Sequence, residues 1–365
     1  MTKKLISVWL SLTILLFSSI SIYAEETVTG SFFFRDIRIN GTQILNYELN
    51  NPLFLYDSTT YIPLSTGLQG ALGLQCEMDW ESRTLKILKT EITKNQVKDA
   101  EVASDMKDVT ATVVEGVKVI TYTEETSPVM EDDWDDSQAT IGAPVLSAHQ
   151  LDLEEFPLLM AGGVVYMPLK ALTDDPNLGI SIYYESYSGV YISTDPNVDA
   201  KTYWNEARSK YNKGLVSYIR KYNNSISVAR AQELVALFQH EADIYGLDET
   251  LLMAVAHKES NFNVQARSRS GAAGIMQVMP RTAAGFGVTE SRLYNAHTSI
   301  NLGARLISGQ LREYNNDMTK ALSAYNQGSG SVNRGSYSTK YATRVMTQQK
   351  SLTEYLTQNG YGLGK

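Results

Sequence analysis

Residues 249–277 read ETLLMAVAHKESNFNVQARSRSGAAGIMQ, an apolar stretch that ends on an acid and continues into a loop rich in serine and glycine. Apolar residues recur there with helical spacing, and Asp248 directly before them is a good N-cap. A similar apolar stripe over 229–245 is followed by Gly246, a residue that commonly ends helices. We therefore expect two successive helices, the second of which ends near Glu259 and leaves that side chain at the lip of a cleft.

Glu259 has the features of a general acid. A carboxyl on an apolar helix loses solvation, which raises its pKa toward the neutral range, where it can protonate a glycosidic oxygen. A single glutamate is more often a solvated surface carboxylate, so this interpretation depends on companion motifs. Two of them follow at 274–277 (GIMQ) and 324–326 (AYN), and Tyr341 comes after them.

These motifs, from Glu259-Ser260 to Tyr341, together resemble those of the soluble lytic transglycosylases, relatives of goose-type lysozyme, over about residues 230–350. The resemblance implies a mainly α-helical, lysozyme-like catalytic domain that acts on peptidoglycan glycan strands, with Glu259 as the acid/base. It also implies substrate contacts for a set of residues on the same segment, namely Ser260, Ser268, Ser270, Met276, Gln277, Tyr325, Asn326 and Tyr341.

The sequence offers Glu259 no obvious second carboxylate. Glycosidases that use two acids hold them about 5 to 9.5 Å apart. The next acid after Glu259 is Glu290, and Glu249 lies about three helical turns back, roughly 15 Å away. A single-acid mechanism is favoured, in which the substrate's N-acetyl group attacks and a 1,6-anhydro-muramic acid end forms. A lysozyme-like hydrolase that borrows Asp243 or Glu241 stays open, as does a non-catalytic wall-binding protein.

We expect no cofactor and no metal. His240-Glu241 has no further histidine at the spacing that a zinc-binding helix requires, which sets a metalloprotease aside. Cys76 is the single cysteine, so no disulfide forms within the chain.

The amino-terminal half contains a repeat. YIPL at 61–64 recurs as YMPL at 166–169, and each copy is followed by a Leu-Gly pair and strand-like sequence. The pattern resembles the copper amine oxidase N-terminal-like domain over roughly 30–90 and, more loosely, 155–195. This resemblance implies a spacer or wall-binding role, and no copper, because the chain has only four histidines and they do not cluster.

The predicted fold class is multidomain, with duplicated α+β amino-terminal modules, each a small sheet-and-helix unit, before the helical lysozyme-like domain. The order expected is a signal peptide over 1–24, the first module over 25–90, an acidic insertion over 91–150, the second module over 151–195, a helical linker over 196–228 and the catalytic domain over 229–365.

The first 24 residues predict export, because Lys3 and Lys4 precede an apolar run that ends near Ala24. An uncleaved anchor is the alternative; with cleavage, no stable membrane span should remain. The protein is then secreted or associated with the cell wall, outside the cytoplasm.

Charge is distributed unevenly along the chain. Residues 25–200 hold 10 Lys and Arg against 29 Asp and Glu, whereas residues 201–365 hold 20 against 11. The basic half suits an anionic partner such as a cell-wall polymer. Nucleic acid is not expected, because no nucleic-acid-binding motif is recognisable and the chain carries an export signal.

Overall fold

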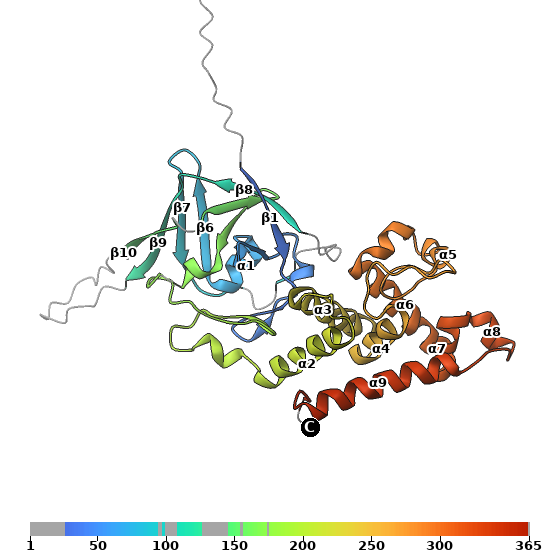
Figure 1. Cartoon of the computed structure of the whole chain (residues 1–365). Helices are drawn as coiled ribbons and strands as arrows, with labels where there is room; N and C mark the ends of the chain where they lie inside the picture. The colour runs from blue at the N-terminus through green and yellow to red at the C-terminus, as the bar shows by residue number, and fades with distance from the viewer. Residues whose placement is uncertain are drawn as a thin grey trace, which may run out of the picture.

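The protein is described by a computed structural model that covers residues 26–93, 97–98, 108–125, 145–153, 156–173 and 175–363. The signal peptide expected over 1–24 and the acidic run at 131–136 lie outside these residues. Strands make up the amino-terminal half and helices the carboxy-terminal half (Figure 1). At this level the expected combination of an α+β half and a mainly helical half is confirmed.

A closed barrel forms the centre of the amino-terminal half. Its strands, in order around the barrel, are β1 (Thr27–Phe32), β4 (Phe54–Tyr56), β5 (Thr59–Pro63), β12 (Val164–Pro168), β11 (Leu158–Ala161) and β8 (Val109–Val114). The ring of Phe54 lies 5.6 Å from that of Tyr61 and 4.8 Å from that of Tyr166, so three buried aromatic rings pack together across neighbouring strands.

Two four-stranded sheets accompany the barrel. One has the order β10 (Val145–Leu151), β9 (Lys118–Glu125), β7 (Thr84–Lys89) and β6 (Leu74–Asp79). The other has the order β13 (Ser181–Glu185), β14 (Gly189–Ser193), β2 (Asp36–Ile39) and β3 (Thr42–Gln43). β14 approaches β2 so closely that a Cβ on Gly189 would lie 1.9 Å from the carbonyl oxygen of Asp36, which explains the glycine.

The two copies of the repeat are interlocked rather than separate. Strands in equivalent positions pair with each other, β1 with β8 and β5 with β12. The last strand of each copy also pairs in parallel with the second strand of the other, β7 with β9 and β14 with β2. α1 (Thr66–Leu72) of the first copy corresponds to the short helix η2 (Leu169–Leu172) of the second. One apolar core therefore contains residues from both copies.

The segment 91–150, expected as an acidic insertion, contributes β8, β9 and most of β10 to this body. Its strands occupy the positions that β1, β2 and β3 hold in the first copy. The recognisable sequence repeat begins only at β5 and β12. The earlier strands of the second copy carry no sequence signal except alternating polar and apolar residues. The expected separate modules are therefore one interlocked body, and the boundaries of the domains within the whole chain stay a prediction.

The carboxy-terminal half is helical. Its helices are η3 (Ala200–Tyr203), α2 (Glu206–Tyr222), α3 (Val228–Tyr245), α4 (Glu249–Ser260), α5 (Pro280–Ala284), η4 (Glu290–Tyr294), α6 (Ala296–Glu313), α7 (Met318–Gln327), α8 (Ser329–Asn333) and α9 (Lys340–Gln358). The helices predicted over 229–245 and toward Glu259 are confirmed as α3 and α4. α4 is buried from Thr250 to Ala256 and packs against α3, α6 and α9.

α2 lies in the segment expected as a helical linker, yet it packs against α3 and α9 and buries Tyr218 and Ile219 in their core. The amino-terminal half, called the barrel body below, contacts the helical half directly. Arg35 donates a 2.9 Å hydrogen bond to the Gln232 side chain, and Phe32 packs in the helical core. In the part of the chain that the structure describes, no helix is long and apolar enough to cross a membrane.

Candidate active site

Glu259 occupies the last turn of α4, and the chain turns sharply just after it. Asn261 caps the helix in the left-handed conformation with φ of 51°, and Phe262 follows with φ of 62°. The Asn261 amide donates a 2.6 Å hydrogen bond to the carbonyl of Tyr222, while the Phe262 ring is only 1% exposed. This anchored turn fixes the end of the helix and with it the position of the Glu259 backbone.

The hydroxyl of Tyr341, in the first turn of α9, donates a 2.5 Å hydrogen bond to Oε1 of Glu259. Burial raises the pKa of Glu259; the Tyr341 hydrogen bond and the charge of Lys258 lower it, but burial prevails. Burial also raises the pKa of Tyr341, and the charge of Glu259 adds to this, so the phenol keeps its proton and remains the donor. The Glu259 carboxyl is thus protonated more readily than an exposed glutamate.

Tyr325 contacts the 274–277 loop rather than Glu259. Its hydroxyl donates a 2.8 Å hydrogen bond to the carbonyl of Met276. Burial raises the pKa of Tyr325, and the nearby charge of Glu259 raises it further. The next residue on α7, Asn326, is exposed.

The 274–277 loop is held from several sides. Gly274 has φ of 79°, and a Cβ there would lie 1.9 Å from the carbonyl oxygen of Leu293, so glycine is required. Ser299, on α6, accepts a 3.2 Å hydrogen bond from the backbone N–H of Met276. Ser260 donates a 2.7 Å hydrogen bond to the carbonyl of Ile275. Glu259 and the loop are therefore tied together through the neighbouring serine.

Two residues expected to contact substrate have structural partners instead of free surfaces. The Ser260 hydroxyl lies against the carbonyls of Ile275 and Ala256, at 2.7 and 3.1 Å. The Met276 side chain is completely buried and packs against Gly303. Their role as substrate contacts stays a prediction, and the described geometry gives both a part in supporting the loop.

Ser268, Ser270 and Gln277 belong to the same loop system. The hydroxyls of Ser268 and Ser270 are 3.0 Å apart, and Ser268 accepts a 2.9 Å hydrogen bond from the N–H of Ala272. Gln277, with φ of 50°, donates to the carbonyls of Ala266 and Gly274. The exposed hydroxyl of Ser270 is available to a ligand, whereas the Gln277 amide holds the loop closed.

Acids considered as a second carboxylate have other surroundings. Three of them interact with side chains other than Glu259. Glu290 forms a 2.9 Å ion pair with Arg267, Glu249 accepts a 3.0 Å hydrogen bond from Tyr211, and Glu241 accepts a 2.8 Å hydrogen bond from Asn301. Asp243 is exposed and lines a cavity of about 610 Å³ between the barrel body and the helices, whose lining does not include Glu259.

Two features of the site were not predicted from the sequence. Ser299 supports Met276 but stands in a helix without a recognisable motif. His297, at the start of α6, lies 3.0 Å from Glu241, so a second histidine does reach His240-Glu241, although from another helix. No spacing rule along a single helix detects such a contact.

Residues 236–345 match a family model described as "Transglycosylase SLT domain". The matched segment runs from the middle of α3 into α9 and includes Glu259, the 274–277 loop, Tyr325 and Tyr341. A "Transglycosylase" of Enterobacteria phage PRD1 is 38% identical over 102 residues, which cover 28% of this chain and 37% of the relative.

Another relative, "Membrane-bound lytic murein transglycosylase C" of Glaesserella parasuis serovar 5, is 35% identical over 121 residues, covering 29% of this chain and 33% of its own length. The chain thus spans about a third of the length of these curated relatives. A solved structure of an inactive mutant of the lytic transglycosylase Slt from Pseudomonas aeruginosa is similar over 45% of this chain and 33% of that chain, with 22% identity and a TM-score of 0.31. The assignment of the SLT domain depends on the family model and the sequence relatives.

Proposed function

We propose that the protein is a peptidoglycan lytic transglycosylase that cleaves the β-1,4 bond between N-acetylmuramic acid and N-acetylglucosamine. The observation that carries the proposal is the half-buried Glu259, whose Oε1 accepts a hydrogen bond from Tyr341, inside the segment that matches the SLT family model. The names of the relatives, one of them a lytic murein transglycosylase, support the same substrate class.

In the proposed reaction Glu259 begins protonated, as its raised pKa favours. It donates its proton to the glycosidic oxygen while the N-acetyl carbonyl oxygen of the muramic acid attacks its own anomeric carbon. The bond between that carbon and the glycosidic oxygen breaks, and the N-acetylglucosamine part leaves with the proton on its new hydroxyl. Glu259 then takes the proton from the C6 hydroxyl of that sugar, whose oxygen displaces the acetamido oxygen and closes a 1,6-anhydro ring. No water is consumed, and Glu259 is protonated again at the end.

Tyr341 holds Oε1 of Glu259, so we assign both proton transfers to Oε2. The phenol steadies the carboxylate that forms after the first transfer, because a hydrogen bond to the charged form stabilises it. Ser268, Ser270, Gln277, Tyr325 and Asn326 are proposed to orient the sugar or the loop beside it, with the exposed Ser270 and Asn326 as direct contacts. These assignments follow the family resemblance of the motifs.

The surroundings of the other acids favour the single-acid route over hydrolysis. A hydrolase would need a second carboxylate about 5 to 9.5 Å from Glu259. Glu241 binds Asn301 and His297, and Asp243 faces the interdomain cavity. A lysozyme-like hydrolase is the second candidate, and it requires one of these acids to move.

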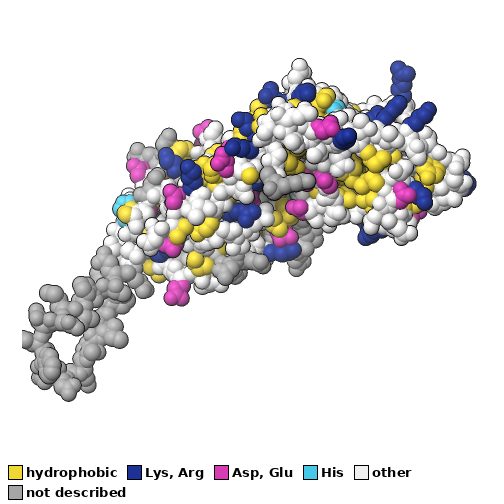
Figure 2. All heavy atoms as spheres, turned by 90° about the horizontal axis from the view of Figure 1, so that it is seen from below, with side chains coloured by type: hydrophobic (Ala, Val, Ile, Leu, Met, Phe, Trp, Pro, Cys, Tyr) yellow, Lys and Arg dark blue, Asp and Glu magenta, His cyan; other side chains and the backbone are white. Residues whose placement is uncertain are grey.

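The amino-terminal body is proposed as a spacer or wall-binding part, as its resemblance to the copper amine oxidase N-terminal-like domain suggests. Equivalent positions of the two copies, Trp80 and Tyr184, are 51% and 48% exposed, and exposed aromatic rings suit stacking on sugars. In Figure 2 the helices lie to the right, where both basic and acidic side chains border an area of hydrophobic ones. The positive balance of 201–365 suits anionic wall polymers.

Murein lies outside the cytoplasm, so a secreted or wall-associated location is part of the proposal. The test is digestion of purified peptidoglycan with the native chain and with Glu259→Gln, followed by mass spectrometry of the muropeptides. Anhydro-muramyl products that are lost with Glu259→Gln support the proposal. Products with reducing ends would favour the hydrolase, and no product from the native chain would favour the wall-binding alternative.

A further inference from the structure

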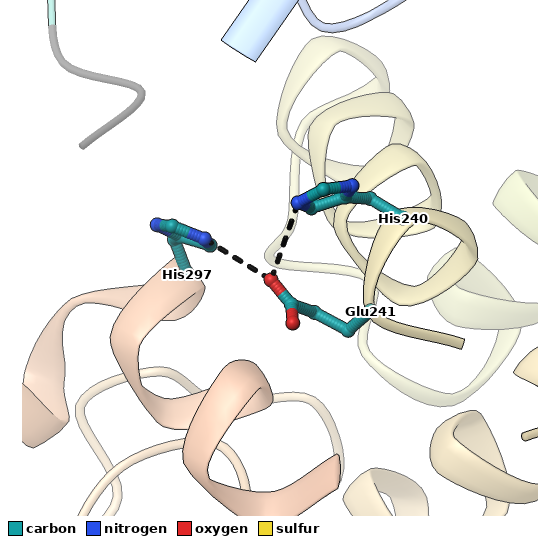
Figure 3. Close-up of side chains that lie close together, drawn as sticks. All are labelled: His240, Glu241 and His297. Carbon is teal, nitrogen blue, oxygen red and sulfur yellow. Dashed lines mark ion pairs between the residues drawn. The ribbon is translucent and has the colours of Figure 1, made fainter. Parts of the chain in front are cut away.

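Three potential metal ligands meet where α3 faces the start of α6. Nε2 of His297 lies 3.0 Å from Oε1 of Glu241, and Nε2 of His240 lies 3.6 Å from the same oxygen. One ligand atom from each of the three residues falls within 4.8 Å of the others. Figure 3 shows both imidazole rings directed at the Glu241 carboxylate from different helices.

The cluster is buried and incompletely hydrogen-bonded. Glu241 is fully buried and His240 is 9% exposed. Oε2 of Glu241 accepts from Asn301, but among the described residues Oε1 has no hydrogen-bond partner, nor has Nδ1 of His240. The two histidine nitrogens lie at ion-pair distance from Oε1, but neither has the geometry of a hydrogen bond to it. A buried carboxylate oxygen without a donor is costly, so this one is suited to a cation.

We infer that His240, Glu241 and His297 form a zinc-binding site. Zinc takes imidazole nitrogen and carboxylate oxygen at about 2.0 to 2.2 Å, which in a tetrahedron places ligand atoms about 3.3 to 3.5 Å apart. The separations of 3.0 and 3.6 Å from Glu241 Oε1 lie on either side of that value, and the nitrogens of the two histidines, within 4.8 Å of each other, would have to close on the ion. The side chain of His297 is 19% exposed, so it has room to adjust toward the ion. Two imidazoles disfavour calcium and magnesium, which prefer oxygen ligands.

The ion would connect α3 to α6 behind the 274–277 loop. Ser299, two residues after His297, accepts the hydrogen bond from the Met276 N–H. The first turn of α6 therefore carries both a zinc ligand and the support of the loop that lies beside Glu259. The Tyr47 ring of the barrel body packs 3.7 Å from the His240 ring, measured between centroids, and shields the site on that side. The ion would hold the two helices together, with its fourth position left to a ligand other than these three residues.

The test is isothermal titration of Zn²⁺ into the full chain after treatment with a chelator and its removal. We expect one high-affinity equivalent, and His297→Ala should weaken that binding at least about tenfold, as loss of one of three ligands implies. His149→Ala is the matched control, because His149 is an exposed histidine of the barrel body and should leave the affinity unchanged. A Zn²⁺ concentration of about one hundred times the native Kd should also raise Tm by about 5 °C in the native chain and by no more than about half of that in His297→Ala.

Circular dichroism of His297→Ala establishes that the variant is folded, and Glu241→Gln gives a second variant that should lose the same equivalent. Absence of tight Zn²⁺ binding to the native chain, or equal affinity in the native chain and both variants, would overturn the inference. Glu259→Gln should bind Zn²⁺ as the native chain does. Failure of the zinc site is therefore distinguishable from failure of the proposed catalytic role.

Discussion

Tyr341 and Glu259 are 82 positions apart in the chain, yet the Tyr341 hydroxyl donates a 2.5 Å hydrogen bond to Glu259 Oε1. The contact joins the end of α4 to the start of α9, two helices that pack along each other. It places a neutral donor on a carboxyl whose pKa burial raises. This balance is what the proposed mechanism requires of Glu259, which would serve first as acid and then as base.

Tyr341→Phe should shift the pH dependence of the reaction. The hydrogen bond stabilises charged Glu259 and lowers its pKa, so its loss raises that pKa further. Because the first step needs protonated Glu259, activity falls as the pH rises through this pKa. The falling alkaline side of kcat/KM should therefore move to higher pH in Tyr341→Phe, even though the maximal rate decreases. The check is a pH profile of muropeptide release by both proteins, and a shift toward lower pH would contradict the assignment.

Gly274→Ala should be strongly destabilising. The new Cβ would lie 1.9 Å from the Leu293 carbonyl, in a residue with φ of 79°. We expect a loss of about 3 kcal/mol or more in the free energy of unfolding. Gly271→Ala is the matched control, because Gly271 also has a positive φ but a Cβ there meets nothing within 4 Å, so it should cost about 1 kcal/mol. Denaturant unfolding of the two variants compares them, and equal losses would show that the Leu293 contact is unimportant.

Tyr325→Phe removes the donor to the Met276 carbonyl and leaves the ring in place. Loss of this hydrogen bond should lower the free energy of unfolding by about 1 kcal/mol. If the hydroxyl acts through the loop, kcat and stability fall together while KM changes little. Steady-state kinetics with a soluble glycan fragment, beside thermal unfolding, measures both effects. A large rise in KM with unchanged stability would instead make Tyr325 a direct substrate contact.

The helical half was largely predictable because its signals are local. The apolar spacing before Gly246 and the N-cap Asp248 mark helix ends that α3 and α4 reproduce. The proposal that Glu259 is the acid/base was based on the ordered motifs, and it stays a prediction. The contacts that support these motifs could not be predicted from the sequence. Ser299 reaches the 274–277 loop, and His297 reaches Glu241, only because α6 packs against them.

The amino-terminal half was predictable as strands but not as an interlocked pair. Pairing of β5 with β12 brings together residues about a hundred positions apart, and a sequence pattern sets which face a strand buries, not which partner it takes. The repeat at 61–64 and 166–169 was the available signal, because these segments turn out to be the strand ends that pair with each other. The recurrence of these segments indicated a duplication, but it did not show that strands of the two copies pair with each other.

The most direct test of the central claim is digestion of peptidoglycan in water enriched in oxygen-18. In the proposed reaction the C6 oxygen of the muramic acid, and not a water oxygen, becomes bonded to the anomeric carbon. The new muramyl ends should therefore carry no heavy oxygen, and they should be lighter than hydrolytic ends by one water. Glu259→Gln should yield none of these products. Muramyl ends that incorporate oxygen-18 would contradict the account and would place a second acid and a water molecule in the site.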